Sequence, residues 1–197
     1  DSGTIIQATI KPVSKTARDT SLCRTIRYDD QQSTVTVNDV VTNIGGQPVP
    51  LCIMYHYNFG YPFLAPGDCL CIPSVSVDCK TPLAELDKGA LLDITSPEVG
   101  YEPRVYRHSF PDDAKWNVIT LQNNEYHIQC MLSASAENLP KLNQWKLFSQ
   151  DQYVLGLEPC NVFPLGYGIL KEKGILPLLS PGTSKEFITS LHFKVIS

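Results

Sequence analysis

Apolar and polar residues alternate along most of this chain with a period of two, which is the pattern of β-strands that bury one face. The first such segment, residues 4–11, is rich in β-branched residues. Residues 21–28 and 33–43 alternate on either side of a polar turn at 29–32, and predict a hairpin. Further alternating segments predict strands over residues 68–77, 104–110, 116–121, 125–133, 144–148, 152–158 and 184–196.

The remaining segments complete an all-β pattern. Residues 50–57 are continuously apolar, which predicts a strand buried on both faces. Helical periodicity is confined to short stretches at 83–91 and 166–173. Most of the 15 prolines fall between the predicted strands, where they interrupt no ladder. Many strands separated by turns are typical of a sandwich or a barrel. We therefore predict an all-β fold in which residues 1–197 form a single β-sandwich domain.

Composition and charge exclude several classes of partner. Hydrophobic residues make up 43% of the chain and charged residues 18%, as in a packed globular protein. The net charge is -4, and the basic residues form no cluster that could follow a phosphate backbone, so nucleic acid is not expected as a partner. The apolar runs are too short to cross a bilayer, so no membrane span is expected.

The cysteines bear on redox compartment and metal binding. They are Cys23, Cys52, Cys69, Cys71, Cys79, Cys130 and Cys160. Their number is odd and their spacing irregular, so we interpret them as buried free thiols and expect a reducing, cytoplasmic compartment. Cys69 and Cys71 lack zinc spacing and are interpreted as two residues on the same face of one strand. No metal is expected.

Common catalytic signatures are absent from the sequence. It contains no Gly-x-Gly-x-x-Gly, no phosphate loop, no Gly-x-Ser-x-Gly elbow and no His-x-x-x-His. Nucleotide chemistry, serine hydrolysis and zinc hydrolysis are therefore disfavoured.

Two proton-transfer groups remain as candidates. His56 ends an apolar run among aromatic residues, where it is either a core histidine with satisfied ring nitrogens or part of a sugar site. Glu158 ends a second apolar run. It is either an ion-pair partner or backbone cap, or a base whose pKa is shifted by partial burial. A His and a Glu in one cleft suffice for general acid–base chemistry.

A tripeptide supplies further polar and aromatic groups. Gln144, Trp145 and Lys146 offer an amide, an indole and a cation in succession. They are either an ordinary amphipathic strand or the wall of a sugar site.

An ordered set of short motifs supports a family resemblance. The motifs are VTNIGGQP at 41–48, PLCIMYHYNFGYP at 50–62, GYEP at 100–103, QWK at 144–146, YVLGLEPCN at 153–161 and LSPGTS at 179–184. With these motifs the chain resembles the galactose mutarotase-like superfamily, and within it the bacterial aldose 1-epimerase-like family of unknown function. The resemblance implies a galactose mutarotase-like supersandwich, of which this chain corresponds to the C-terminal two thirds.

The resemblance also implies roles for particular residues. His56 holds the place of the acid that protonates the ring oxygen, and Glu158 that of the base that takes the anomeric proton. Candidates for holding hydroxyls or an anionic group are Asn58, Gln144, Trp145, Lys146 and Asn161. The implied activity is that of an aldose 1-epimerase on a small-molecule sugar or sugar derivative, without metal or organic cofactor. The alternatives are a non-catalytic carbohydrate-binding protein and an oligomerisation scaffold.

The sequence departs from the family pattern at two points. Family members are longer at the N-terminus, and the extra part usually carries a second sugar-contacting His and an Arg. In addition, Tyr55 stands where Asn usually precedes the catalytic His. We therefore expect the sandwich to lack N-terminal strands, as the C-terminal part of a longer domain. The edges left exposed would favour pairing with another chain, and hence a homo-oligomer.

Overall fold

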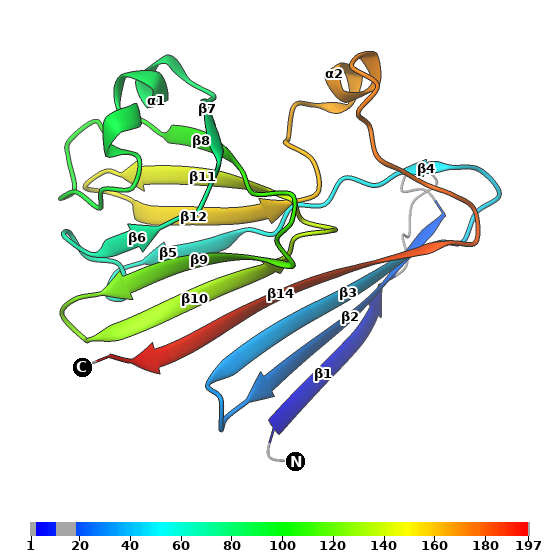
Figure 1. Ribbon diagram of the computed structural model, residues 1–197, viewed down its shortest axis with the longest axis horizontal. Helices are drawn as coiled ribbons and strands as arrows, with labels where there is room; N and C mark the ends of the chain where they lie inside the picture. Colours follow the sequence, from blue (N-terminus) through cyan, green and yellow to red (C-terminus); the bar gives the residue numbers. More distant parts are fainter. Residues whose placement is uncertain (1–2, 11–18, 197) are drawn as a thin grey trace.

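Two antiparallel sheets form the body of the protein (Figure 1). The computed structural model describes residues 3–10 and 19–196. The larger sheet has the strand order β1 (Gly3–Ile10), β2 (Thr20–Asp29), β3 (Thr34–Asn43), β14 (Ser184–Val195), β10 (Ile128–Ser135), β9 (Trp116–Asn123) and β6 (Cys69–Cys71). The smaller sheet has the order β5 (Tyr57–Gly60), β12 (Tyr153–Cys160), β11 (Lys141–Phe148), β8 (Arg104–Ser109) and β7 (Ser76–Cys79). The all-β prediction is confirmed.

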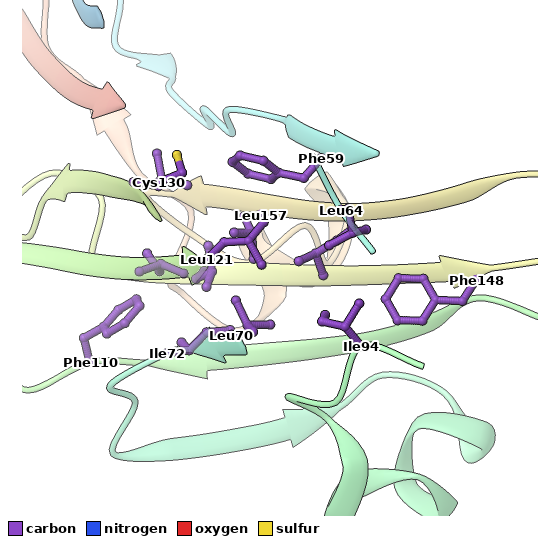
Figure 2. Packing of buried hydrophobic residues seen from close by; sticks show 14 residues of the cluster. Phe59, Leu64, Leu70, Ile72, Ile94, Phe110, Leu121, Cys130, Phe148 and Leu157 are labelled. Carbon is purple, nitrogen blue, oxygen red and sulfur yellow. The ribbon is translucent and has the colours of Figure 1, made fainter. Parts of the chain in front are cut away.

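The two sheets are stacked around a hydrophobic core, which Figure 2 shows from close by. Leu121 and Cys130 enter it from β9 and β10, and Phe148 and Leu157 from β11 and β12. All four side chains are almost completely buried. Because successive side chains of a strand point to opposite faces, this core fixes which residues of the smaller sheet face outward.

A second apolar cluster lies where β3 and β14 meet the segment before β5. Phe187 of β14 is fully buried there against Leu51 and Tyr55. Beside it, β4 (Val49–Pro50) and β13 (Leu178–Leu179) form a short two-stranded ladder. This cluster holds an irregular stretch of chain, residues 51–56, against the larger sheet.

The continuous strand predicted over residues 50–57 is wrong. The structure has strand only at its two ends, in β4 and β5. Between them the backbone bonds to other segments: the Leu51 amide donates to the Pro177 carbonyl, the Ile53 amide to Asn161 Oδ1 and the Tyr55 amide to the Pro159 carbonyl. The apolar run therefore reflects burial of alternate side chains without regular pairing.

The other predicted strands are found with shifts of a few residues at their ends, with one exception. The predicted strand at 68–77 is two strands, β6 and β7, one in each sheet. Residue 11 of the first predicted strand lies outside the described residues. The helical stretches form α1 (Pro82–Leu86) with a 3-10 turn at Lys88–Ala90, and α2 (Tyr167–Glu172). No helix in the described part of the chain is long and apolar enough to cross a membrane.

All seven cysteines are free, but the prediction that they are buried is wrong for three of them. Only Cys130 and Cys160 are buried, whereas Cys52, Cys69 and Cys71 are exposed. Cys69 and Cys71 do share one face of β6, with the buried Leu70 between them on the other face. The prediction of two same-face residues on one strand is therefore confirmed, but that face of β6 is exposed to solvent and not buried.

The first three strands extend beyond the stacked region (Figure 1). Every residue of β1 is exposed, including Ile5 and Ile6, which point to opposite faces. β1 therefore adds backbone pairing to the larger sheet but contributes no side chain to either core cluster.

Candidate active site

The candidate site lies on the outer face of the smaller sheet. On β12, Leu155 and Leu157 point into the core, so Gly156 and Glu158 face the other way. Across the ladder, Gly156 pairs with Trp145 of β11 and with Asn58 of β5, and Glu158 pairs with Asn143 of β11. The register thus gathers a carboxylate, an indole and two amides on one surface.

The structure brings the two predicted catalytic residues into direct contact. His56 Nε2 lies 2.9 Å from Glu158 Oε1. The Glu158 side chain is 3% exposed and the His56 side chain 45% exposed. The carboxylate therefore sits at the floor of the site, on a central strand, and the imidazole covers it from the solvent side.

Glu158 is held in an environment that makes it more basic than an ordinary carboxylate. Burial raises the pKa of Glu158, and this is the largest effect on it. A hydrogen bond from Asn143 Nδ2 to Oε2, at 2.6 Å, and the nearby His56 and Lys80 act in the opposite direction. The two carboxylate oxygens thus have different partners: Oε2 accepts from the Asn143 side chain, and Oε1 faces the His56 imidazole.

Trp145 forms the wall beside this pair. Its indole meets the His56 ring edge to face, with ring centroids 6.1 Å apart. Gly156 leaves room for the arrangement, because a β-carbon there would lie 2.9 Å from Glu158 Oε1 and 3.3 Å from the Trp145 side chain. A glycine in mid-strand, usually unfavourable, is therefore accounted for by the approach of the carboxylate and the indole.

The position of His56 depends on a buried ionic group beneath the preceding residue. Tyr55 donates its hydroxyl to Asp39 Oδ2 at 2.7 Å. Arg24 binds the same carboxylate with two hydrogen bonds, of 2.8 Å from Nε and 2.6 Å from Nη2. Since Asp39 is fully buried, this group anchors the irregular segment 51–56 to β2 and β3. Tyr55 thus has a structural part in the site.

Gln144 and Lys146, predicted to bind substrate, lie on the wrong face of β11. Gln144 is fully buried, bonded to His108 Nε2 at 2.9 Å and to the Leu91 carbonyl at 2.8 Å. Lys146 Nζ donates to the carbonyls of Ala90 and Asp93. The alternation of a strand separates both from Trp145, so these two predictions are corrected: they fasten the 3-10 turn and the chain after it to the sheet.

The two predicted asparagines differ from each other. The Asn161 side chain holds the irregular segment 51–56 to the end of β12: its Nδ2 donates to the Leu51 carbonyl, and its Oδ1 accepts from the Ile53 amide. Its polar atoms are thereby used within the protein, which corrects its assignment as a sugar ligand. Asn58 is exposed on β5, opposite Gly156 and on the face of the acid–base pair, and remains a candidate.

Three residues on this face were missed by the sequence prediction. Asn143 binds Glu158, and Arg107 stands opposite Asn143 on β8. Lys141 lies two residues before Asn143 on β11 and so faces the same way. Strand alternation counted from Trp145 would have selected Asn143 and Lys141 in place of Gln144 and Lys146.

An apolar cavity of about 590 Å³ borders the site. Met54, Phe163 and Tyr167 are among its lining residues. Neither His56 nor Glu158 is among the residues that line this cavity. Among the described residues, no group of three or more His, Cys, Asp or Glu side chains could hold a metal ion.

The geometry places a carboxylate and an imidazole side by side on one face of the sheet. A buried carboxylate can accept a proton, and an exposed imidazole in contact with it can donate one. Such a pair suits a substrate whose proton donor and proton acceptor are neighbours. The pair needs no further protein group to exchange protons with a small polar molecule.

Solved structures with the same fold show low sequence identity to this chain. A candidate aldose 1-epimerase from Klebsiella pneumoniae aligns with a TM-score of 0.90 and 21% identity, over 98% of this chain and 51% of that one. A candidate aldose 1-epimerase from Escherichia coli K12 aligns with a TM-score of 0.62 and 16% identity, over 98% and 66% of the two chains. A galactose mutarotase-like protein from Clostridium acetobutylicum gives 0.64 and 13%, over 98% and 62%.

These likenesses establish the galactose mutarotase-like fold, which confirms the predicted resemblance and fold class. The chain spans about half the length of the Klebsiella protein. No curated protein sequence matches it. The sequence model of one family, described as a domain of unknown function (DUF4432), matches residues 2–193. Since this match covers almost all of the chain, the protein belongs to the DUF4432 family.

Proposed function

We propose that this chain carries the acid–base centre of an aldose 1-epimerase, in which Glu158 is the base and His56 the acid. The observation that carries the proposal is the 2.9 Å contact between His56 Nε2 and the buried Glu158 Oε1. The names of the Klebsiella and Escherichia coli structures support the same reaction class.

The substrate chemistry explains why the two groups lie so close. In a pyranose, the anomeric hydroxyl oxygen O1 and the ring oxygen O5 are bonded to the same carbon, C1. A base acting on O1 and an acid acting on O5 must therefore be neighbours. The sugar binds with C1 over the pair and takes the place of their mutual hydrogen bond. Trp145 offers its indole to the apolar C–H face of the ring.

The reaction moves two protons and opens one bond. Glu158 takes the proton of the O1 hydroxyl, the electrons of that O–H bond form the C1=O1 double bond, and the C1–O5 bond breaks. The electron pair of the broken bond goes to O5, which takes a proton from the His56 imidazolium. Rotation about C1–C2 presents the other face of the aldehyde. The steps then reverse: O5 attacks C1 and gives its proton back to His56, while O1 takes the proton back from Glu158, and the other anomer forms.

The raised pKa of Glu158 suits this role. Burial raises the pKa of Glu158, and a more basic carboxylate takes up a proton more readily. Asn143 limits the shift by its hydrogen bond to Oε2. No metal or organic cofactor takes part in the proposed reaction, because two proton transfers are enough to open and re-form the C1–O5 bond. The seven free thiols agree with a reducing cytoplasmic location, which we include in the proposal.

The test is the anomer exchange rate of a panel of free aldoses, followed by NMR. Glu158→Gln keeps the shape of the side chain, removes the base and should lower the exchange rate by about 10²–10⁴-fold. Glu172→Gln is the matched control, because it removes an exposed carboxylate of α2 away from the pair, and should leave the rate unchanged.

The alternative is a carbohydrate-binding protein that uses the same face without catalysis. It predicts that a sugar shifts the resonances of Trp145 while its anomer exchange stays at the uncatalysed rate. That result with the wild-type chain would refute the catalytic proposal.

A further inference from the structure

A basic pair lies on the same sheet face as the acid–base centre, although the whole chain has a net charge of -4. It consists of Arg107 on β8 and Lys141 on β11. Neither residue has a part in the proton transfers proposed above. The proton-transfer mechanism therefore does not explain why two cationic side chains lie on this face.

The register places the two basic residues one and two strands away from Glu158 on the same face of the sheet. Glu158, Asn143 and Arg107 are successive partners across β12, β11 and β8. With neighbouring strands about 4.8 Å apart, the backbone of Arg107 lies about 10 Å from that of Glu158. Lys141 stands next to this row, opposite Cys160. A hexopyranose bound with C1 at Glu158 would direct its far end toward these cations.

The two cationic side chains converge on one aromatic ring. The Arg107 guanidinium carbon lies 5.9 Å and Lys141 Nζ 5.7 Å from the centroid of the Phe163 ring. Both distances are in the range of cation–π contacts. The ring thus keeps two like charges together at one place, where their repulsion is best relieved by an anion.

The existing partners leave much of this charge available. Lys141 Nζ is bonded to the neutral hydroxyl of Ser109 at 2.9 Å. Arg107 contacts Asp78 through Nη1 at 3.2 Å, but the Asp78 side chain is 70% exposed. Arg107 Nε is buried and has no hydrogen-bond partner among the described residues. A guanidinium has five N–H donors, so one exposed carboxylate does not saturate it.

The pKa of the Cys160 thiol responds to charges from both the acid–base centre and the basic pair, which indicates that the two groups lie close together. Burial raises the pKa of Cys160 to about 12, and the charge of Glu158 acts in the same direction. Lys141 and Arg107 act in the opposite direction. All three charged groups are therefore close enough to the same buried sulfur to influence it.

We propose that Arg107 and Lys141 form an anion subsite, which selects sugars bearing an anionic group at the end remote from the anomeric carbon. The inference rests on the proposed function for the position of C1. A carboxylate, as in a hexuronic acid, can accept N–H donors from both residues. A sugar 6-phosphate offers the same chemistry with a larger group, so the two sources are compared directly.

The experiment measures binding and anomer exchange separately, with glucose, glucuronate and glucose 6-phosphate as probes. Binding is followed by NMR titration of the intact chain, which needs no turnover. We expect at least one anionic sugar to bind at least about tenfold more tightly than glucose, the gain from one good charge-assisted hydrogen bond. The anion that gains more identifies the source.

The variants Lys141→Met and Arg107→Met should each remove most of this preference while leaving glucose affinity unchanged. Lys194→Met is the matched control, since it removes the same charge from β14 in the other sheet. Lys141→Met keeps the proposal testable if Arg107→Met fails to fold, because the Lys141 amine makes one described hydrogen bond, to the Ser109 hydroxyl, beside its contact with the Phe163 ring.

The outcomes separate the two proposals. Equal binding of neutral and anionic sugars, or a preference that survives Lys141→Met, overturns the subsite. Accelerated exchange of glucose without any anion preference overturns the subsite alone. Preferential binding that depends on Lys141, without accelerated exchange of any probe, supports the subsite and refutes the acid–base proposal. Absence of any binding refutes the subsite as well.

Discussion

Replacing Asp39 by alanine should destabilise the protein strongly. The substitution removes the buried carboxylate that accepts two hydrogen bonds from Arg24 and one from Tyr55. Breaking a buried ion pair by removing one partner costs about 3–5 kcal/mol. The lower end of that range applies here, because the Arg24 side chain is 39% exposed and water can solvate its charge again. The Tyr55 hydroxyl is left buried without its acceptor.

We therefore expect the free energy of unfolding to fall by about 3 kcal/mol. For a chain of this size, such a loss lowers Tm by about 6–12 °C. Urea denaturation of wild type and Asp39→Ala at 25 °C measures the difference. Asp30→Ala is the control, because it removes an exposed carboxylate from the β2–β3 turn and should leave the unfolding free energy within about 0.5 kcal/mol of wild type.

A second comparison tests the physical reason for the loss. If the cost arises from unpaired polar groups, the triple variant Asp39→Leu, Arg24→Met, Tyr55→Phe should regain most of the lost stability, since an apolar cluster replaces the whole ionic group. A loss below about 1 kcal/mol for Asp39→Ala would refute the argument. So would a triple variant less stable than Asp39→Ala, because the cost would then lie in packing.

Three further predictions concern the smaller sheet. Asn143→Leu removes the hydrogen bond that lowers the pKa of Glu158, so the acid limb of the pH profile of kcat/KM should move to higher pH. If pH–rate measurements show the acid limb at the same pH in the variant, Glu158 is not the base that this limb reports. Gly156→Ala places a methyl group 2.9 Å from Glu158 Oε1. It should lower the anomer exchange rate at least about tenfold and the free energy of unfolding by about 1–3 kcal/mol. The control Gly168→Ala, whose methyl group meets no neighbour, should change neither the rate nor the stability. Burial lowers the pKa of Lys146 to about 8, below the value of about 10.4 in an unfolded chain, so between these pH values the unfolded state holds more protons and stability rises with pH. The rise in unfolding free energy between pH 7 and pH 10 is worth about 3 kcal/mol and should be missing from Lys146→Met when both proteins are unfolded with urea at the two pH values. Thiols that titrate in this range do so in both proteins, so their effect cancels in the difference. An equal pH dependence of the unfolding free energy in wild type and Lys146→Met would show that Lys146 does not titrate there.

The strands could be predicted because each buries one face, which leaves a period of two in the sequence. The segment before His56 could not be predicted, because residues 51–56 bury alternate side chains while their backbone bonds to segments distant in sequence. Periodicity records which side chains are buried, but not what the backbone pairs with.

The contact between His56 and Glu158 was predictable only through the family resemblance. The two residues are far apart in the chain, and the Met54–Cys160 bridge that brings their segments together has no local signal. The ligands proposed around them failed for a different reason. Gln144, Trp145 and Lys146 were treated as one group, although adjacent residues of a strand face opposite sides. A strict count from Trp145 would have excluded both of its neighbours.

The exposure of β1 has a consequence for how its register is held. In most strands a slip by one residue would move the buried face to solvent, and this cost fixes the pairing. β1 has no buried face, and Ile5 and Ile6 are 56% and 59% exposed, so a slip against β2 loses no core contact. What distinguishes the native pairing is local: Gln7 reaches Thr25, and Gly3 lies so close to β2 that a β-carbon would stand 2.6 Å from the Tyr28 carbonyl oxygen. One glycine and one amide thus align a strand that the hydrophobic effect leaves unaligned.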